Sequence, residues 1–133
     1  MNQKDILLCT LNSTYQHSSF GLRYLLANMG DLKPRTQILE WTIKANPRSI
    51  VEKIVALNPK IVGFSVYIWN TTETLEVLMI LKKVAPEIMV VLGGPEISFE
   101  THSQPHLKWC DFVIQGEADF SFPEFCTNWL QHG

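Results

Sequence analysis

The chain has 133 residues, of which 46% are hydrophobic and 18% are charged, and its formal net charge is -2. This composition is globular and excludes a disordered or fibrous protein, and the length fits one domain. The scattered Lys and Arg residues form no basic patch, and no apolar run approaches the roughly 20 residues of a membrane span. We therefore expect a single cytoplasmic domain over residues 1–133, with no nucleic acid and no membrane among its partners.

The first elements in chain order are a strand, a helix and a second strand. Asp5–Thr10 is a short apolar run of the strand type. Apolar residues at helical spacing begin with Phe20, and Gly30 is a plausible stop for that helix. A second strand pattern follows at Thr36–Thr42.

The middle of the chain repeats this alternation. Asn46 precedes Pro47, a pair that predicts a helix with an Asn cap and a Pro at its first position. Lys60–Tyr67 is a nearly continuous hydrophobic run, as in strands buried on both faces. A third helical stripe follows, with Thr71 or Thr72 available as its cap.

The last third contains two more strand patterns and a final helix. Ile88–Gly93 is again almost wholly apolar, and Asp111–Gln115 is the fifth run. Between them Ile97–Trp109 follows neither period well and predicts a loop with a short helix. The closing helix begins close to Ala118.

This order predicts an α/β fold with three layers, in which helices cover both faces of a doubly wound, five-stranded parallel sheet. The leading topology is flavodoxin-like, and a Rossmann-like strand order is the alternative. In such sheets ligands bind beyond the carboxyl ends of the strands, where the strand order reverses. The candidate site residues therefore follow the strands: Ser13, Thr14, Tyr15 and His17; Ser65, Tyr67, Trp69 and Asn70; Gly93, Gly94, Pro95 and Glu96; Gly116 and Glu117.

Each type of side chain in this set has a chemical use and a plain alternative. Gly93 and Gly94 allow close approach of a ligand or form an ordinary tight turn. Ser65 offers a hydroxyl to the crevice or to a neighbouring main chain. Tyr67 and Trp69 flank a flat ligand, or they belong to the core or a lid.

His17 is a metal ligand, a general base or a solvated side chain. Glu96 and Glu117 bind ligand hydroxyls or amides, or they are helix N-terminal charges. The cysteines are odd in number and widely spaced, which favours buried free thiols over a disulfide or a metal set. They are Cys9, Cys110 and Cys126.

Several sites of other kinds are excluded by missing motifs. No Gly-rich fingerprint follows the first strand, and no Gly-Lys-Ser/Thr loop for a nucleoside triphosphate is present. Ser65 stands where a phosphoacceptor receiver domain would place an Asp, and no serine has a nucleophile-elbow pattern.

Three segments together resemble the N-terminal cobalamin-binding domain of cobalamin-dependent radical S-adenosylmethionine proteins. The segments are Val62–Tyr67, Val90–Glu96 and Asp111–Ala118, and His17–Leu25 resembles the family's first-helix opening. The specific signal is Leu-Gly-Gly-Pro-Glu followed about twenty residues later by Asp-x-Val-Ile-x-Gly-Glu.

The resemblance implies that cobalamin binds across the carboxyl ends of the strands with its nucleotide tail displaced from cobalt. The tail would enter a slot lined by Ser65, Gly93 and Gly94, and the loop residues would cover the corrin. The Asp-x-His-x-x-Gly motif, whose His ligates cobalt in other cobalamin domains, is missing after the first strand. The resemblance therefore implies binding without a histidine lower ligand, and His17 stays a site candidate.

The chain has no Cys-x-x-x-Cys-x-x-Cys motif. The resemblance thus implies that the 4Fe-4S cluster and S-adenosylmethionine belong to a radical domain after Gly133, which makes this chain a non-catalytic module of a methyltransferase. Two alternatives remain at this point. One is a flavin mononucleotide site in the same crevice, and the other is a ligand-free interaction domain that docks through Trp41, Trp69 and Trp109.

Overall fold

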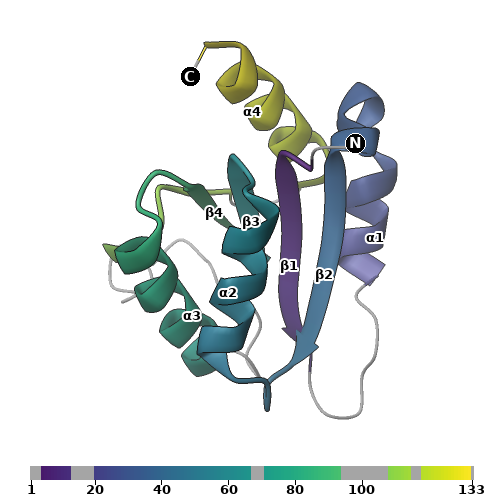
Figure 1. The fold of residues 1–133 in the computed structure, drawn as a ribbon. Coiled ribbons are helices and arrows are strands. Elements are labelled where there is room, and N and C mark those ends of the chain that lie inside the picture. The colour runs from purple at the N-terminus through teal and green to yellow at the C-terminus, as the bar shows by residue number, and fades with distance from the viewer. Residues whose placement is uncertain (1–3, 13–19, 67–70, 94–107, 115–117, 133) are drawn as a thin grey trace.

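Five parallel strands form the sheet at the centre of this computed structural model, in the order β2-β1-β3-β4-β5 (Figure 1). The structure describes residues 4–12, 20–66, 71–93, 108–114 and 118–132. The strand order is the flavodoxin-like one, and it confirms the leading topology over the Rossmann-like alternative. The strands are β1 Ile6–Asn12, β2 Thr36–Thr42, β3 Ile61–Ser65, β4 Met89–Gly93 and β5 Phe112–Val113.

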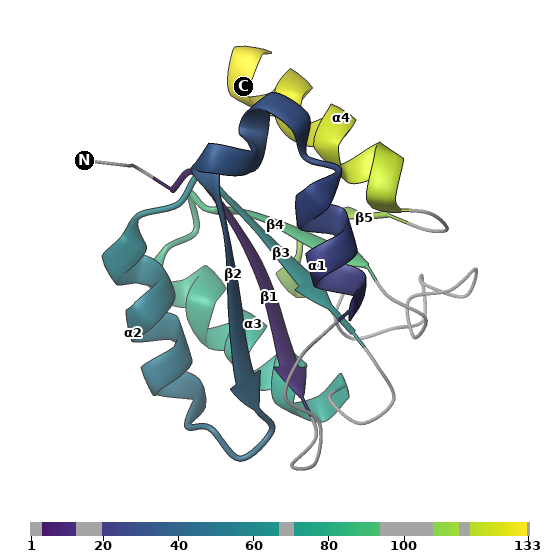
Figure 2. The same ribbon diagram turned by 90° about the vertical axis from the view of Figure 1, so that its right-hand side faces the viewer.

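Helices cover both faces of the sheet, which confirms the three-layer, doubly wound architecture. In Figure 2, α2 and α3 lie on one side of the strands, and α1 and α4 lie on the other. We call these sides the α2/α3 face and the α1/α4 face. The helices are α1 Phe20–Ala27, α2 Pro47–Leu57, α3 Thr71–Val84 and α4 Ala118–His132, with a 3-10 helix η1 at Gly30–Arg35.

Alternation along each strand divides the core in two. From β1, Leu7, Cys9 and Leu11 join the core beneath α2 and α3. Ile6 and Leu8 join the core beneath α1 and α4. Because all of these side chains are buried, β1 contributes to both cores.

Local chemistry sets the start of α2 where the sequence predicted it. The Asn46 side chain accepts a hydrogen bond from the Arg48 N–H at 2.8 Å, so Asn46 caps α2 and Pro47 is its first residue. Asn58 ends α2 in the left-handed region at φ 51°. The start of α4 at Ala118 also agrees with the prediction, whereas α3 begins at Thr71, one residue earlier than a Thr71 cap would place it.

Some predicted boundaries were wrong. β1 runs two residues past Thr10, to Asn12, because it stays paired with β2 up to Thr42. β3 and β5 are shorter than predicted. The 3-10 helix η1 was not predicted, and it forms because Leu32 is buried against the core and the Thr36 hydroxyl donates to the Leu32 carbonyl at 2.7 Å. The predicted loop over 97–109 lies outside the described residues except for its last two.

Parallel pairing brings the carboxyl ends of the strands to one edge of the sheet, toward which the β1 and β2 arrowheads point in Figure 1. The chain leaves β1 for β2 on one side and returns to β3 on the other, so the strand order reverses between β1 and β3. Ligand crevices of open parallel sheets form at such a point.

Candidate functional site

Two of the predicted site residues, Ser65 and Gly93, belong to the described part of the chain. The other predicted residues follow the described strand ends and lie outside the described residues. These are Ser13, Thr14, Tyr15, His17, Tyr67, Trp69, Asn70, Gly94, Pro95, Glu96, Gly116 and Glu117.

Ser65 and Gly93 lie side by side as Cα partners at the ends of β3 and β4. The two strands remain joined at this level, because the Val66 N–H donates to the Gly93 carbonyl at 2.8 Å. Both residues are only partly buried, in contrast to the fully apolar strand positions before them. The structure therefore brings the predicted serine and the first predicted glycine together.

The missing side chain of Gly93 leaves room at this place. A Cβ built on Gly93 would have the Ile114 carbonyl oxygen as its nearest neighbour, at 3.7 Å, an ordinary contact distance. The described surroundings of Gly93 thus contain no side chain that fills the space above it. Among the described residues, only the Ile114 carbonyl oxygen lies within contact distance of this point of the main chain.

Alternation assigns Ser65 and Gly93 to the α1/α4 face. Ile61 and Met89, an even number of positions earlier in the same strands, belong to the core beneath α1 and α4. In β1 the residues of this parity at the carboxyl end are Thr10 and Asn12. The register pairs Thr10 with Glu40 of β2, and the β1–β3 register continued by one position places Thr10 beside Ser65.

Glu40, Thr10, Ser65 and Gly93 therefore form one row across four neighbouring strands, which we call the carboxyl-end row. Every member is small or polar, although the core positions before them are apolar. Sequence reasoning missed Thr10 and Glu40. The available signal was a single hydroxyl residue, Thr10, inside the otherwise apolar run Ile6–Leu11.

The Glu40 carboxylate is held from two sides. Arg23 of α1 donates to its Oε1 at 2.8 Å, and the Asn12 amide donates to its Oε2 at 2.7 Å. The Glu40 side chain is 12% exposed and that of Arg23 is 55% exposed, so the pair reaches from the row toward solvent. This network ties the end of β1 to α1 and β2.

Gly63 lies two residues before Ser65 in β3, on the same face of the sheet, and it leaves space for α4 to pack. A Cβ on Gly63 would lie 3.2 Å from Cζ of Phe122, which is tighter than most real contacts. Phe122 is buried, and it occupies the space that a larger residue would need. On the α1/α4 face, the Phe122 ring therefore fills the space at Gly63, whereas the next residue of β3 on this face, Ser65, is small and polar.

The edge strand β5 is fixed by Asp111. Its Oδ2 accepts hydrogen bonds from Lys82 Nζ at 2.6 Å and from the Val90 N–H at 2.8 Å. The Ile114 N–H donates to the Leu92 carbonyl at 2.9 Å. These bonds hold Ile114, the neighbour of Gly93, at the border of the candidate site.

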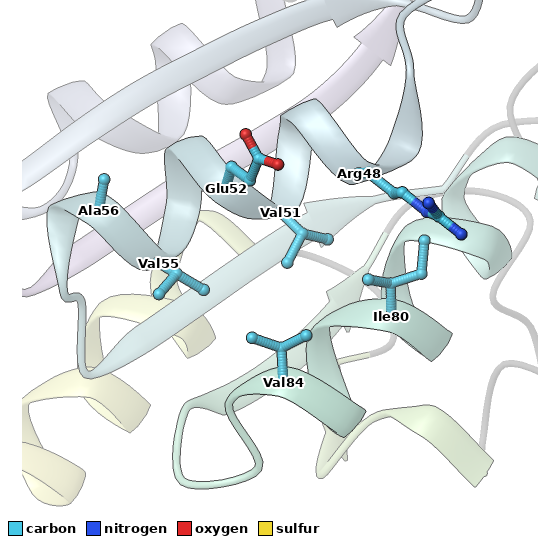
Figure 3. Close-up of a pocket in the computed structure, with 7 residues that line it drawn as sticks. All are labelled: Arg48, Val51, Glu52, Val55, Ala56, Ile80 and Val84. Carbon is cyan, nitrogen blue, oxygen red and sulfur yellow. The ribbon is translucent and has the colours of Figure 1, made fainter.

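The outer layer of the α2/α3 face contains an apolar groove of about 500 Å³ (Figure 3). Among the described residues, those that line it all belong to helices, and no described strand end contributes to it. They are Arg48, Val51, Glu52, Val55, Ala56, Ile80 and Val84. This groove lies on the opposite side of the sheet from the carboxyl-end row.

The cysteines are free thiols. Cys9 and Cys126 are buried, as predicted, whereas Cys110 is half-buried. Burial raises the pKa of Cys9, and it raises the pKa of Cys126 to about 12. Burial and the neighbouring Asp111 raise the pKa of Cys110 to about 11, with Lys82 opposing them. Each thiol is therefore protonated at neutral pH, and within the described ranges no three His, Cys, Asp or Glu side chains gather as a metal site would require.

Trp41 and Trp109 occupy different parts of the fold. Trp41 belongs to β2, at one edge of the sheet, and Trp109 precedes β5, at the other edge. Both pack partly against the core, and Lys83 lies 5.8 Å from the Trp109 ring centroid. The two rings therefore do not share one docking surface.

Among the described helices, none has the length and apolar character needed to cross a membrane.

Comparison with known families gives a match over most of the chain. Residues 6–125 match the B12 binding domain family. The match includes all five strands, α1 to α3 and the larger part of α4, and with them the whole carboxyl-end row.

Individual relatives are similar over only part of their own length. The cobalamin-dependent radical SAM methyltransferase TokK of Streptomyces tokunonensis is 28% identical over 80 residues, which cover 56% of this chain and 11% of TokK. The aqua-cobalamin-bound radical SAM enzyme OxsB superposes with a TM-score of 0.77 at 12% identity, over 95% of this chain and 18% of OxsB. A cobalamin-binding protein from Desulfitobacterium hafniense DCB-2 superposes with a TM-score of 0.68 at 17% identity, over 96% of this chain and 60% of that protein.

Proposed function

This chain belongs to the B12 binding domain family, and from this premise we propose that it is the cobalamin-carrying module of a radical S-adenosylmethionine methyltransferase. Family membership confirms cobalamin, predicted above from the strand-end motifs, as the cofactor. It also decides between cobalamin and the alternative of a flavin mononucleotide. When bound, cobalamin supplies a cobalt ion that can carry a methyl group.

The observation that carries the proposal is the pairing of Ser65 with Gly93 on the α1/α4 face. Cobalamin is a large ligand with a nucleotide tail, so a domain that buries the tail needs room beside the sheet and a polar group to meet it. Gly93 provides the room, since the nearest atom to a Cβ would be 3.7 Å away. Ser65 provides a hydroxyl on the neighbouring strand. The described residues thus fit the cofactor.

In the proposed arrangement the tail lies along the carboxyl-end row and the corrin lies across the strand ends. Gly94 would continue the open wall that begins at Gly93. The remaining predicted residues would meet the corrin from the loops: Ser13, Thr14, Tyr15, His17, Tyr67, Trp69, Asn70, Pro95, Glu96, Gly116 and Glu117. We propose base-off binding without a histidine lower ligand, because the chain lacks the Asp-x-His-x-x-Gly spacing after β1.

The proposed catalytic partner is a downstream radical domain that holds the 4Fe-4S cluster and S-adenosylmethionine. Two facts support it. The chain spans 11% of TokK and 18% of OxsB, both named as cobalamin-dependent radical enzymes. The chain itself has no cysteine triad of the required spacing. We infer that the chain supplies a bound cofactor and that chemistry on the substrate takes place in the partner domain.

The direct test is reconstitution. The purified domain is mixed with hydroxocobalamin, desalted and measured by visible absorption. We expect coloured protein with a stoichiometry near one, and a colourless protein would reject the proposed function. After reduction to the cobalt(II) state, electron paramagnetic resonance should show no nitrogen superhyperfine splitting, and His17→Ala should leave this spectrum unchanged. A splitting that vanishes in His17→Ala would reject binding without a histidine ligand and leave cobalamin binding intact.

A further inference from the structure

Thr10 carries a polar group for which the described part of the chain offers no partner. The side chain belongs to β1, beside the central strand β3, and is 0% exposed, and its Oγ1 makes no hydrogen bond with any described residue. Buried hydroxyls are almost always hydrogen-bonded, because a buried unpaired one loses its bonds to water without replacement. The unpaired Thr10 hydroxyl therefore destabilises the ligand-free domain, and a ligand that bonds it would remove this cost.

The neighbours of Thr10 on the carboxyl-end row are occupied in other ways. Glu40, its Cα partner on β2, directs Oε1 to Arg23 and Oε2 to Asn12. On the other side stands Ser65, and beyond it Gly93 has no side chain to offer. The Thr10 hydroxyl thus lies beside Ser65 in the row and has no hydrogen bond to a described member of it.

We propose that Thr10 is a further cofactor-binding residue, whose hydroxyl bonds a polar atom of the cobalamin nucleotide tail. This inference rests on the proposed function, in which the tail lies along the α1/α4 face beside Ser65 and Gly93. Thr10 is on the same face, one strand further, at the point where the strand order reverses. A ligand that enters at Gly93 and follows the row past Ser65 reaches Thr10 next.

If the Thr10 hydroxyl binds the tail, its removal should leave the stability of the domain unchanged or raised and should weaken the binding of hydroxocobalamin. Thr10→Val keeps the shape of the side chain and removes the oxygen. The ligand-free variant should unfold at the same temperature as the wild type or a higher one, because an unpaired buried hydroxyl has been deleted. The Kd for hydroxocobalamin, from a titration followed by absorbance, should rise about tenfold. Thr10→Ser, which keeps a hydroxyl, should bind within about threefold of the wild type.

Thr74 offers a matched control. It is also a threonine, is also 0% exposed and also has an Oγ1 without a hydrogen bond in the described structure. It belongs to α3, which packs on the α2/α3 face. Thr74→Val should reproduce the effect of Thr10→Val on the unfolding temperature and leave the Kd for hydroxocobalamin unchanged.

Cobinamide, which has the corrin but lacks the nucleotide tail, identifies the part of the cofactor involved. Thr10→Val should bind cobinamide as the wild type does. Equal weakening for both ligands would overturn the assignment to the tail. An unchanged Kd for hydroxocobalamin, or a ligand-free Thr10→Val protein that is less stable or fails to fold, would also overturn it, since the hydroxyl would then have a partner within the chain. These outcomes concern Thr10 alone, because failure of the proposed function shows as a wild-type domain that binds no hydroxocobalamin.

Discussion

On the α2/α3 face, the last side chains of the three central strands are Leu11, Phe64 and Leu92, all buried. On the α1/α4 face, the last residues of the same strands are Asn12, Ser65 and Gly93. Each strand therefore ends in a large apolar residue followed by a small or polar one. Because successive residues point to opposite faces, this pairing closes one face with core packing and leaves the other fit for a ligand.

The comparison separates stability from binding. Below the row both faces are apolar, and each supports its own pair of helices. Only at the carboxyl end do the faces differ. We thus expect substitutions deep in either core to affect folding alike, and substitutions in the row to affect cobalamin far more than folding.

The largest expected effect is on folding, and it should be similar on the two faces. Phe122→Ala removes the ring that covers Gly63, and Ile54→Ala removes a buried side chain of α2. Each should lower the free energy of unfolding by about 3–5 kcal/mol, because each leaves a cavity in a packed core. Urea denaturation of the ligand-free domain measures both. A cost below about 1 kcal/mol for Phe122→Ala alone would show that the α1/α4 layer is loosely packed throughout.

The next effect should appear on one face only. Gly93→Leu places a large side chain where the tail is proposed to enter, and we expect the Kd for hydroxocobalamin to rise on the order of 100-fold, equivalent to about 2.7 kcal/mol. The fold should persist, since the Ile114 carbonyl is the only described group that a Cβ there meets, and it lies at contact distance. Ala56→Leu adds similar bulk in the groove on the opposite layer and should bind as the wild type does. Normal binding by Gly93→Leu would contradict the slot at this position.

A smaller effect is expected from Asp111, which fixes β5 at the border of the candidate site. Asp111→Asn removes the charge that accepts from Lys82 and Val90. We expect about 1–2 kcal/mol of lost stability, because hydrogen bonds to a charged group are strong and this one is partly exposed. Hydrogen exchange should quicken at the Ile114 amide, and denaturation should give the global loss. The control is Glu76→Gln, an exposed substitution on α3. An equal loss of stability in this variant would contradict the claim that the hydrogen bonds of Asp111 stabilise β5.

The sequence allowed prediction of features that rest on local chemistry. The Asn46 cap followed by Pro47 fixed the start of α2, and the apolar runs located all five strands. Ser65 and Gly93 were predicted as site residues because each stands at the end of an apolar run. Their placement as Cα partners was not predicted, because it depends on the register between β3 and β4.

Features that depend on contacts between distant segments were beyond such prediction. The position of Thr10 beside Ser65 is set by the β1–β3 register, which no local pattern encodes. The need for Gly63 arises from Phe122, a residue of α4 far along the chain. The η1 helix forms where burial of Leu32 outweighs weak local preference. The row as a whole is thus a product of the sheet register.

The smallest effect concerns the cysteines, and it compares the two cores directly. Iodoacetamide reacts with thiolates, so the raised pKa values should make the folded domain slow to label at pH 8. Cys110, half-buried with a pKa of about 11, should label first, and about 100-fold faster at pH 10 because the thiolate fraction grows tenfold per pH unit below the pKa. Cys9 lies in the α2/α3 core and Cys126 in the α1/α4 core, and both should stay unlabelled, as mass spectrometry of the digested protein would show. Labelling of Cys126 before Cys9 would mean that the α1/α4 layer opens more readily than the α2/α3 layer. If hydroxocobalamin suppressed that labelling, the opening would involve the side of the sheet on which the cofactor is proposed to bind.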